Sequence, residues 1–291
     1  MKRLRHHTKG TAIVLSCFGS VVEQQRYLIL QQRIAERYPD CAVKIAFSSK
    51  MVVKKLALQG EQYQGLPQVL ADLDMEGFQR ILVVSCYLFP TDEHLQVCNM
   101  VQGFRQFSLA NIEHTPAIMH HTSHTSAILA ALNARFASDS DVNLFIHHGA
   151  PLLDNPGHQA IHYCDSLLSK LSTKNFTCSL EGAWPYRLIS ESLEQEMLQV
   201  TQNTRPSVSS QDVKPRLRLV PLLLVSGNHF VNDLADIKQD LEPVFDVSAA
   251  TPISGDRFCL LDLPELIAVV EQQIADGLVR LRAPETEVCC G

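Results

Sequence analysis

Two histidines and one glutamate stand where chemistry is expected. His148 and His229 each follow an apolar segment of the kind that forms a buried strand, and Glu93 follows a third such segment. Imidazole nitrogens bind borderline divalent metal ions and accept protons near neutral pH, and a carboxylate does both as well. These residue types predict a site that holds a metal ion and moves protons. The alternative is that the histidines cap or pack helices and that Glu93 is a first-turn carboxylate.

Ser48, Ser49 and Lys50 form a candidate anion site. They open a predicted helix, where free backbone N–H groups favour a negatively charged ligand. A solvated helix face would use the same residues. Gly19 and Gly149 each follow a predicted strand and are typical of tight turns, at which we expect the same ligand to bind.

Other potential metal ligands are less well placed. His120 and His124 have the i, i+4 spacing of a helical metal site, but Thr122 between them indicates a helix N-cap instead. The pair Cys289 and Cys290 would suit a soft metal ion, at a chain end that is expected to fray. The chain contains no GxGxxG, GxxxxGK[ST] or GxSxG motif. This predicts that no nucleotide binds and argues against an α/β-hydrolase.

Apolar and helical segments alternate along the whole chain and must position these residues. The apolar segments are rich in Val, Ile and Leu without period-2 alternation, as expected for parallel strands covered on both faces. Strands are predicted for residues 11–17, 42–47, 80–86, 115–119, 142–147, 177–181, 216–225 and 245–249. Helices are predicted for residues 21–38, 50–58, 67–76, 92–107, 123–135, 158–171, 190–201, 230–239 and 264–277. This order predicts parallel sheets with right-handed crossovers.

The predicted elements also repeat once along the chain. Three residue pairs recur at offsets of 130, 134 and 135, namely Gly19 with Gly149, Phe47 with Glu181, and His94 with His229. We therefore predict two similar α/β lobes, residues 1–138 and 139–291, with both candidate histidines in the second. The polar segment 203–215 is predicted to be an inserted surface loop. Ligands of parallel sheets bind beyond the carboxyl ends of the strands, so the site is expected in a cleft between the lobes.

Composition limits the class of protein. The 291 residues are 46% hydrophobic, so a sizeable core is expected. A net charge of −6 provides no general basic field for nucleic acid. No apolar run reaches the roughly 18 residues of a membrane span, and the run at Ala12–Leu15 is shorter than the core of an export signal. Nine scattered cysteines without a CxxC motif favour the reducing cytoplasm over a disulfide framework.

Several stretches together resemble the anaerobic class II cobalt chelatases, which insert Co²⁺ into sirohydrochlorin in cobalamin biosynthesis. They occur in the order of that family: Ser16–Ser20 (SCFGS), Ala46–Leu56 (AFSSKMVVKKL), Asp92–Glu93, His147–Ala150 (HHGA) and Pro221–Leu234 (PLLLVSGNHFVNDL). The last stretch is the most specific. The resemblance implies an α/β fold of two pseudo-symmetric flavodoxin-like lobes, each a parallel sheet flanked by helices, with a cleft between them.

The resemblance also implies an activity and roles for particular residues. The chain is expected to be a sirohydrochlorin cobaltochelatase in which His148, His229 and Glu93 bind the metal ion and act as catalytic groups. Glu181 matches the region of a further cleft carboxylate less securely. The expected contacts of the tetrapyrrole are Gly19, Ser48, Ser49, Lys50 and Gly149. The missing nucleotide motifs add the expectation that ATP is not needed.

Alternatives to cobalt insertion remain at this point. Iron- and nickel-inserting relatives share the ligand set, so Fe²⁺ and Ni²⁺ are alternative substrates. A tetrapyrrole or metal carrier without catalysis is a second alternative, and a hydrolase or lyase with Ser20 or Ser226 as its nucleophile is a third. The expected partner is a sirohydrochlorin-like tetrapyrrole, with neither nucleic acid nor membrane, and homo-oligomer formation is left open.

Overall fold

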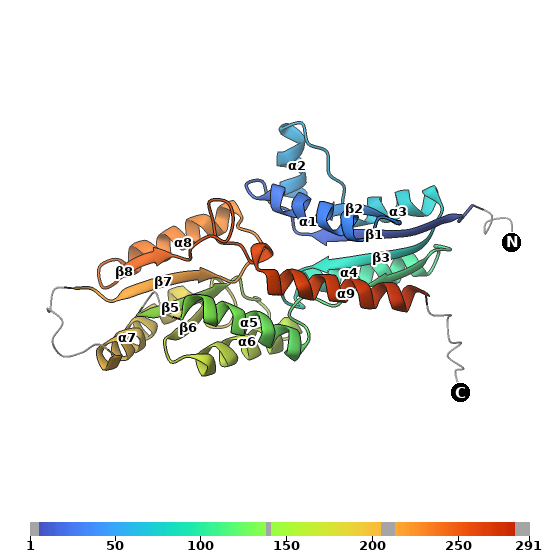
Figure 1. The fold of residues 1–291 in the computed structure, drawn as a ribbon. Helices are drawn as coiled ribbons and strands as arrows, with labels where there is room; N and C mark the ends of the chain where they lie inside the picture. The colour runs from blue at the N-terminus through green and yellow to red at the C-terminus, as the bar shows by residue number, and fades with distance from the viewer. Residues whose placement is uncertain (1–5, 138–140, 205–212, 283–291) are drawn as a thin grey trace.

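The computed structural model describes residues 6–137, 141–204 and 213–282, with the backbone alone at residues 204 and 228–230. Figure 1 shows two lobes side by side, and each is built on a four-stranded parallel sheet. The first sheet contains β1 (Lys9–Cys17), β2 (Cys41–Phe47), β3 (Phe78–Cys86) and β4 (Asn111–His114). The second contains β5 (Val142–His147), β6 (Asn175–Ser179), β7 (Arg216–Pro221) and β8 (Asp246–Ala249).

Helices cover both faces of each sheet. They are α1 (Gln24–Arg37), α2 (Lys50–Leu58), α3 (Leu66–Glu76), α4 (Asp92–Arg105), α5 (Thr122–Phe136), α6 (Gly157–Leu171), α7 (Tyr186–Thr204), α8 (Asn228–Leu241), the short 3₁₀ helix η2 (Leu260–Asp262) and α9 (Pro264–Arg282). On the first sheet, α3 and α4 pack on one face, and α1 and α9 on the other. On the second, α7 and α8 oppose α5 and α6. Within the described part of the chain, no helix has the length and apolar character of a membrane span.

Both sheets have the same strand order, which confirms the predicted fold class. The orders are β2-β1-β3-β4 and β6-β5-β7-β8, so each strand of the first lobe has a counterpart in the second. In both sheets the central pair is parallel and, apart from exposed or half-buried residues near the starts of β1, β3 and β7, buried, which explains the apolar runs without alternation. Because all strands of a sheet point the same way, the loops after them gather at one edge.

The predicted fourth strand was wrong. Residues 115–119 are buried and apolar, yet β4 is the more polar segment Asn111–His114 just before them. Pro116 has no backbone N–H and cannot join a hydrogen-bonded ladder. The N–H groups of Ile118 and Met119 bond instead to the loop that follows β3. This segment is apolar because it is buried, and its sequence therefore resembled that of a strand.

Two further strands end earlier than predicted. β6 ends at Ser179, not at Glu181, and β7 ends at Pro221, not at residue 225. Proline ends the β7 ladder because it has no N–H to donate. At the other end of this lobe, α7 extends to Thr204, into the segment predicted as a loop. Residues 205–212 of that predicted loop lie outside the described residues.

Two of the predicted repeat pairs are corrected, one by the strand register and the other by the starts of two helices. Cys17 pairs with Phe47 in the first sheet and His147 pairs with Ser179 in the second, so the counterpart of Phe47 is Ser179. Helices α4 and α8 begin at residues 92 and 228, which makes their second residues equivalent. The counterpart of His229 is therefore Glu93, not His94. Two of the three predicted metal ligands thus occupy the same position in the two lobes.

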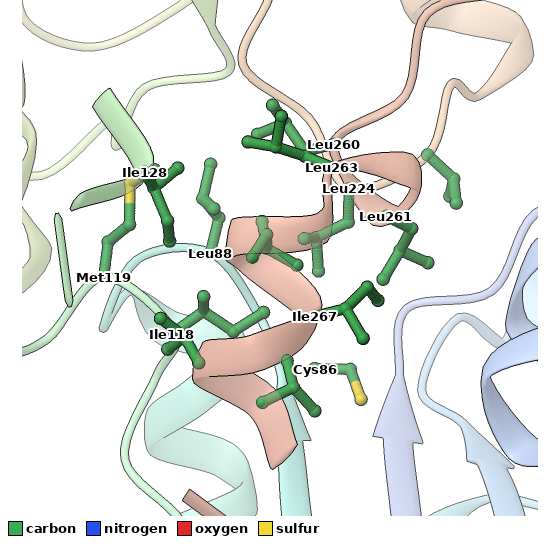
Figure 2. Packing of buried hydrophobic residues seen from close by; sticks show 14 of the residues in the cluster. Cys86, Leu88, Ile118, Met119, Ile128, Leu224, Leu260, Leu261, Leu263 and Ile267 are labelled. Atoms are coloured by element: carbon green, nitrogen blue, oxygen red, sulfur yellow. The ribbon is translucent and has the colours of Figure 1, made fainter. Parts of the chain in front are cut away.

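One continuous core joins the lobes. It includes residues of β1 and β3 from the first sheet, β5 and β7 from the second, and α5, α6 and α9. Figure 1 shows α9, which follows the second sheet in the sequence, lying along the first sheet. Around the start of α9, Figure 2 shows Leu88 and Ile118 of the first lobe near Leu224 and Leu263. The predicted domain boundary between residues 138 and 139 stays a prediction. Helix α9 belongs to the second half of the sequence but packs on the sheet of the first.

We expect Gly149→Ala to lower the free energy of unfolding by about 3 kcal/mol or more. Gly149 has a φ of +91°, and an added Cβ would lie 1.6 Å from the carbonyl oxygen of Glu181. Neither backbone can move freely, because the Glu181 N–H donates to the His148 carbonyl at 3.0 Å. Gly103→Ala is the control, since Gly103 lies inside α4 with nothing within 4 Å of an added Cβ. That variant should gain about 0.5–1 kcal/mol. Equal urea midpoints for both variants would refute the close approach.

Candidate functional site

A cleft of about 360 Å³ lies between the lobes, at the carboxyl edges of both sheets. Its walls come from the loops after β1, β3, β5 and β7. Its floor is mostly apolar and includes Tyr27, Leu88, Phe89, Leu222 and Leu224. A pocket with an apolar floor and few polar groups at its edge is typical of a site for a flat organic ligand.

Most predicted site residues line this cleft. Those that do are Gly19, Ser49, Glu93, His148 and Gly149. Ser48 and Lys50 are exposed and are not among the lining residues of the cleft. The lysine that does line it is Lys55, which shares a face of α2 with Met51 because they are four residues apart. Sequence reasoning chose the first residue of α2, whereas the helix face that meets the cleft carries Met51 and Lys55.

His148 is exposed and paired with a carboxylate. Its side chain is 62% exposed, and its Nδ1 lies 3.2 Å from Oε1 of Glu181. The pairing places Nδ1 next to the carboxylate and leaves Nε2 on the other side of the imidazole ring. Pairing of a histidine with a carboxylate is also how proteins orient imidazole ligands of metal ions. Glu181 is thus a partner of His148 in this structure.

Glu93 lies in the first turn of α4, as predicted. Its Oε2 accepts a hydrogen bond of 2.9 Å from the hydroxyl of Thr91, the N-cap residue. Both residues line the cleft. The free N–H groups of the first turn stabilise the charged carboxylate in this position. Glu93 is therefore a first-turn glutamate of α4 and at the same time a residue of the cleft, so the two interpretations are compatible.

His229 is the second residue of α8, and its side chain lies outside the described residues. Gly227, the N-cap of α8, lines the cleft, so the first turn of this helix begins there. Among the described side chains, no three His, Cys, Asp or Glu residues lie close enough to share a metal ion. The ligand set His148, His229 and Glu93 stays a prediction.

A second, smaller hollow of about 260 Å³ adjoins the cleft. Both are lined by His148, Leu180 and Asp233, while the smaller one also includes Asp236 and Asp240. His148 therefore lies between an apolar cleft and an acidic hollow. The negative charge beside the imidazole favours cations over anions in this part of the site.

The histidines near residue 120 do not share a helix. α5 begins at Thr122 with His121 as its N-cap, so the predicted cap at Thr122 is displaced by one residue. His120 precedes the helix, and its i, i+4 relation to His124 is not helical. The ring centroids of His120 and His121 are 5.1 Å apart, and those of His121 and His124 are 5.4 Å apart. Cys289 and Cys290, the other predicted alternative, lie outside the described residues.

Sequence reasoning missed a buried histidine beside Glu93. The Nδ1 of His94 lies 2.7 Å from Oγ of Ser85, and its Nε2 lies 3.4 Å from Sγ of Cys98. His94 is 7% exposed. Burial, followed by the nearby charges of His114 and His120, lowers the pKa of His94 to about 4. The apolar pattern of α4 gave a usable signal, since His94, Val97 and Val101 share its buried face.

The lowered pKa of His94 predicts acid sensitivity. The unfolded chain takes up a proton at His94 below about pH 6.5, whereas the folded chain does so only near pH 4. Stability from the neutral ring is therefore complete above pH 6.5 and is lost as the pH falls towards 4. Between pH 7.5 and pH 5 we expect the free energy of unfolding to fall by about 2 kcal/mol more in the wild type than in His94→Asn. Urea unfolding at both pH values measures it, and identical losses would contradict it.

A chelatase is among the solved structures that share this fold. SirB from Bacillus subtilis with Fe³⁺ superimposes with a TM-score of 0.61 at 14% identity, covering 92% of this chain and 95% of SirB. The sirohydrochlorin chelatase SirB from Bacillus subtilis subspecies spizizenii, in complex with cobalt, gives a TM-score of 0.57 at 13% identity, covering 92% and 95%. At such identities the likeness establishes the fold, which is the class II chelatase architecture of two pseudo-symmetric lobes.

The family follows from the sequence match. Residues 11–243 match the cobalt chelatase (CbiK) family, and the chain belongs to that family. A sirohydrochlorin cobaltochelatase from Salmonella typhimurium is 23% identical over 229 residues, which cover 78% of this chain and 77% of the relative. The resemblance noted from SCFGS, HHGA and the segment 221–234 is thereby confirmed.

Proposed function

We propose that this chain is an enzyme that inserts a divalent metal ion, Co²⁺ in the first place, into sirohydrochlorin within the interlobe cleft. Membership of the cobalt chelatase family supports the activity. The observation that supports the location is the cleft itself, which brings His148 of the second lobe and Glu93 of the first to one apolar cavity. The tetrapyrrole and the metal ion are both substrates.

The pairing of His148 gives it a chemical role. Metal insertion requires that the ion lose water and that two pyrrole nitrogens lose their protons. With Nδ1 beside Glu181, Nε2 is the ring nitrogen that we propose binds the ion or accepts a pyrrole proton. Glu181 stabilises the imidazolium that proton transfer creates. His148, Glu93 and His229 are proposed for the metal and proton steps together.

Helix N-termini at the cleft suit a polyanionic substrate. Sirohydrochlorin has eight carboxylates, whereas the chain has a net charge of −6. The cap residues of α2, α4 and α8, which are Ser49, Thr91 and Gly227, all line the cleft. Their free N–H groups and the ammonium of Lys55 are the groups available for the carboxylates. Gly19 and Gly149 are proposed to let the macrocycle approach the backbone.

The structure does not favour Ser20 as the nucleophile of a hydrolase. Oγ of Ser20 donates to the backbone carbonyl of Ser226 at 3.0 Å and accepts the N–H of Glu23 at 3.0 Å. Its proton is therefore directed at a carbonyl rather than at a base. A carrier without catalysis, and insertion of Fe²⁺ or Ni²⁺, remain to be separated from cobalt insertion by experiment.

The experiment is anaerobic absorbance spectroscopy of sirohydrochlorin with purified protein and Co²⁺, Fe²⁺ or Ni²⁺, without nucleotide. We expect metallation faster than in the protein-free control, with Co²⁺ the best ion and no effect of added ATP. Binding of sirohydrochlorin without metallation by any ion would reject the enzyme and favour the carrier. A higher rate with Fe²⁺ or Ni²⁺ would correct the metal and keep the enzyme.

A further inference from the structure

The hydroxyl of Ser20 links the two lobes. Its Oγ lies 3.0 Å from the carbonyl oxygen of Ser226, which is 206 residues further along the chain. Ser20 is 3% exposed and Ser226 is 4% exposed, so water competes little for this hydrogen bond. Ser226 directly precedes Gly227, the N-cap of α8. The hydrogen bond therefore ties the loop after β1 to the start of α8.

The same oxygen also organises its own lobe. Ser20 Oγ accepts the N–H groups of Val22 at 3.3 Å and Glu23 at 3.0 Å, next to the start of α1. A hydroxyl has a single hydrogen to donate, and here it goes to Ser226. Ser20 thus acts as an acceptor within the first lobe and as a donor to the second.

The repeat offers an internal comparison for this hydroxyl. Gly19 and Gly149 have φ values of +93° and +91°, which makes the next residues, Ser20 and Ala150, equivalent. Ala150 is 2% exposed and has no hydroxyl. The glycine turn therefore forms without a serine in the second lobe. Ser20 differs from Ala150 in two ways: it accepts the N–H groups of Val22 and Glu23, and it donates to the other lobe.

The loop before α8 is held from its other side as well. The N–H groups of Leu260 and Leu261 donate to the carbonyls of Leu223 and Leu224 at 3.0 and 3.1 Å. These bonds fix the beginning of the loop, and the Ser20 bond fixes its end. The first turn of α8 starts immediately after that end.

We propose that Ser20 is a positioning residue, whose hydroxyl holds the first turn of α8, with His229, in place relative to Glu93 of the other lobe. The inference rests on the proposed function, in which both residues act on the metal ion. Glu93 and His229 occupy equivalent positions on α4 and α8, so their separation depends on how the lobes are joined. A ligand set assembled from two lobes needs such a fixed joint to be preorganised.

Hydrogen–deuterium exchange tests the link without reference to activity. In Ser20→Ala we expect exchange of the backbone amides at residues 231–234, beginning with Val231, whose N–H donates to the Gly227 carbonyl at 3.1 Å, to rise about fivefold, since one buried hydrogen bond is lost. Ser108→Ala is the matched control, because Ser108 Oγ accepts the N–H of Ala110 and donates to Asp74, within the first lobe only. That variant should leave residues 231–234 unchanged. Faster exchange confined to residues 21–24 would reduce Ser20 to a local cap and overturn the proposal.

Kinetics then connect the link to insertion. Ser20→Ala should lower kcat about tenfold with little change in KM for the tetrapyrrole, and Ser20→Thr, which keeps the hydroxyl, should retain kcat. Wild-type kcat in Ser20→Ala would refute the positioning role even if exchange rises. If the wild-type protein shows no insertion at all, the proposed function fails, while the exchange result still decides whether Ser20 holds α8. The alanine variant suffices if the threonine variant does not fold.

Discussion

Replacing His148 by alanine should lower kcat for metal insertion by about 100-fold or more, because the proposed general base or metal ligand is lost. Its side chain is 62% exposed, so little packing is lost with it. The free energy of unfolding should therefore change by no more than about 0.5 kcal/mol. Single-turnover absorbance of sirohydrochlorin with Co²⁺ measures the rate, and urea unfolding measures the stability.

The matched control for this substitution is His162→Ala. His162 is an exposed histidine on α6 of the same lobe and is not among the lining residues of the cleft. It should keep the wild-type rate. A folded His148→Ala variant that metallates at the wild-type rate would remove His148 from the site and leave the family assignment unaffected.

The largest loss of stability is expected for Arg26→Ala, about 3–5 kcal/mol of the free energy of unfolding. The Arg26 side chain is 7% exposed, and its guanidinium bonds Glu23 at 2.6 Å and also contacts Asp262. It donates further hydrogen bonds to the carbonyls of Ser254 and Arg257, both at 3.0 Å. Removing the guanidinium would leave the largely buried Asp262 without its cation and Glu23 with the more distant Arg257, at 3.9 Å.

Arg33→Ala tests whether burial is the reason. Arg33 lies on the same helix, α1, and its Nε is 2.7 Å from Oε1 of Glu271, but its side chain is 57% exposed. Because Arg33 is exposed and Glu271 keeps Arg37 at 3.2 Å, this variant should lose no more than about 1 kcal/mol. Chemical denaturation of both variants at one pH gives the comparison. Equal losses of unfolding free energy in the two variants would show that the ion pairs of Arg26 contribute no more than an exposed surface pair.

The fold was largely predictable because its signals are local. Each buried parallel strand is an uninterrupted apolar run, and the limits predicted for residues 142–147 and 50–58 agree with β5 and α2. The fourth strand failed because residues 115–119 are buried for a tertiary reason, with Pro116 preventing a ladder. A buried loop and a buried strand both appear in the sequence as a run of apolar residues. The hydrogen bonds that tell them apart are made to another part of the chain, here the loop after β3.

The site was predictable only in part, because its geometry depends on which helix face meets the cleft. Glu93 and His148 follow strands directly, so the carboxyl-edge rule located them. Lys55 lies a turn and a half inside α2, and the rotation of that helix is set by packing. His94 was paired with His229 because both are histidines, whereas the helix starts show that Glu93 is the counterpart. Long-range links such as Ser20 to Ser226 leave no local pattern in the sequence.

The most direct test of the account is a crystal structure with sirohydrochlorin and Co²⁺, measured at the cobalt absorption edge. We expect the macrocycle in the cleft between the lobes. We also expect a cobalt anomalous peak at about 2 Å from Nε2 of His148 or at the centre of the macrocycle beside it. A tetrapyrrole bound outside the cleft, or cobalt bound away from both His148 and Glu93, would contradict it.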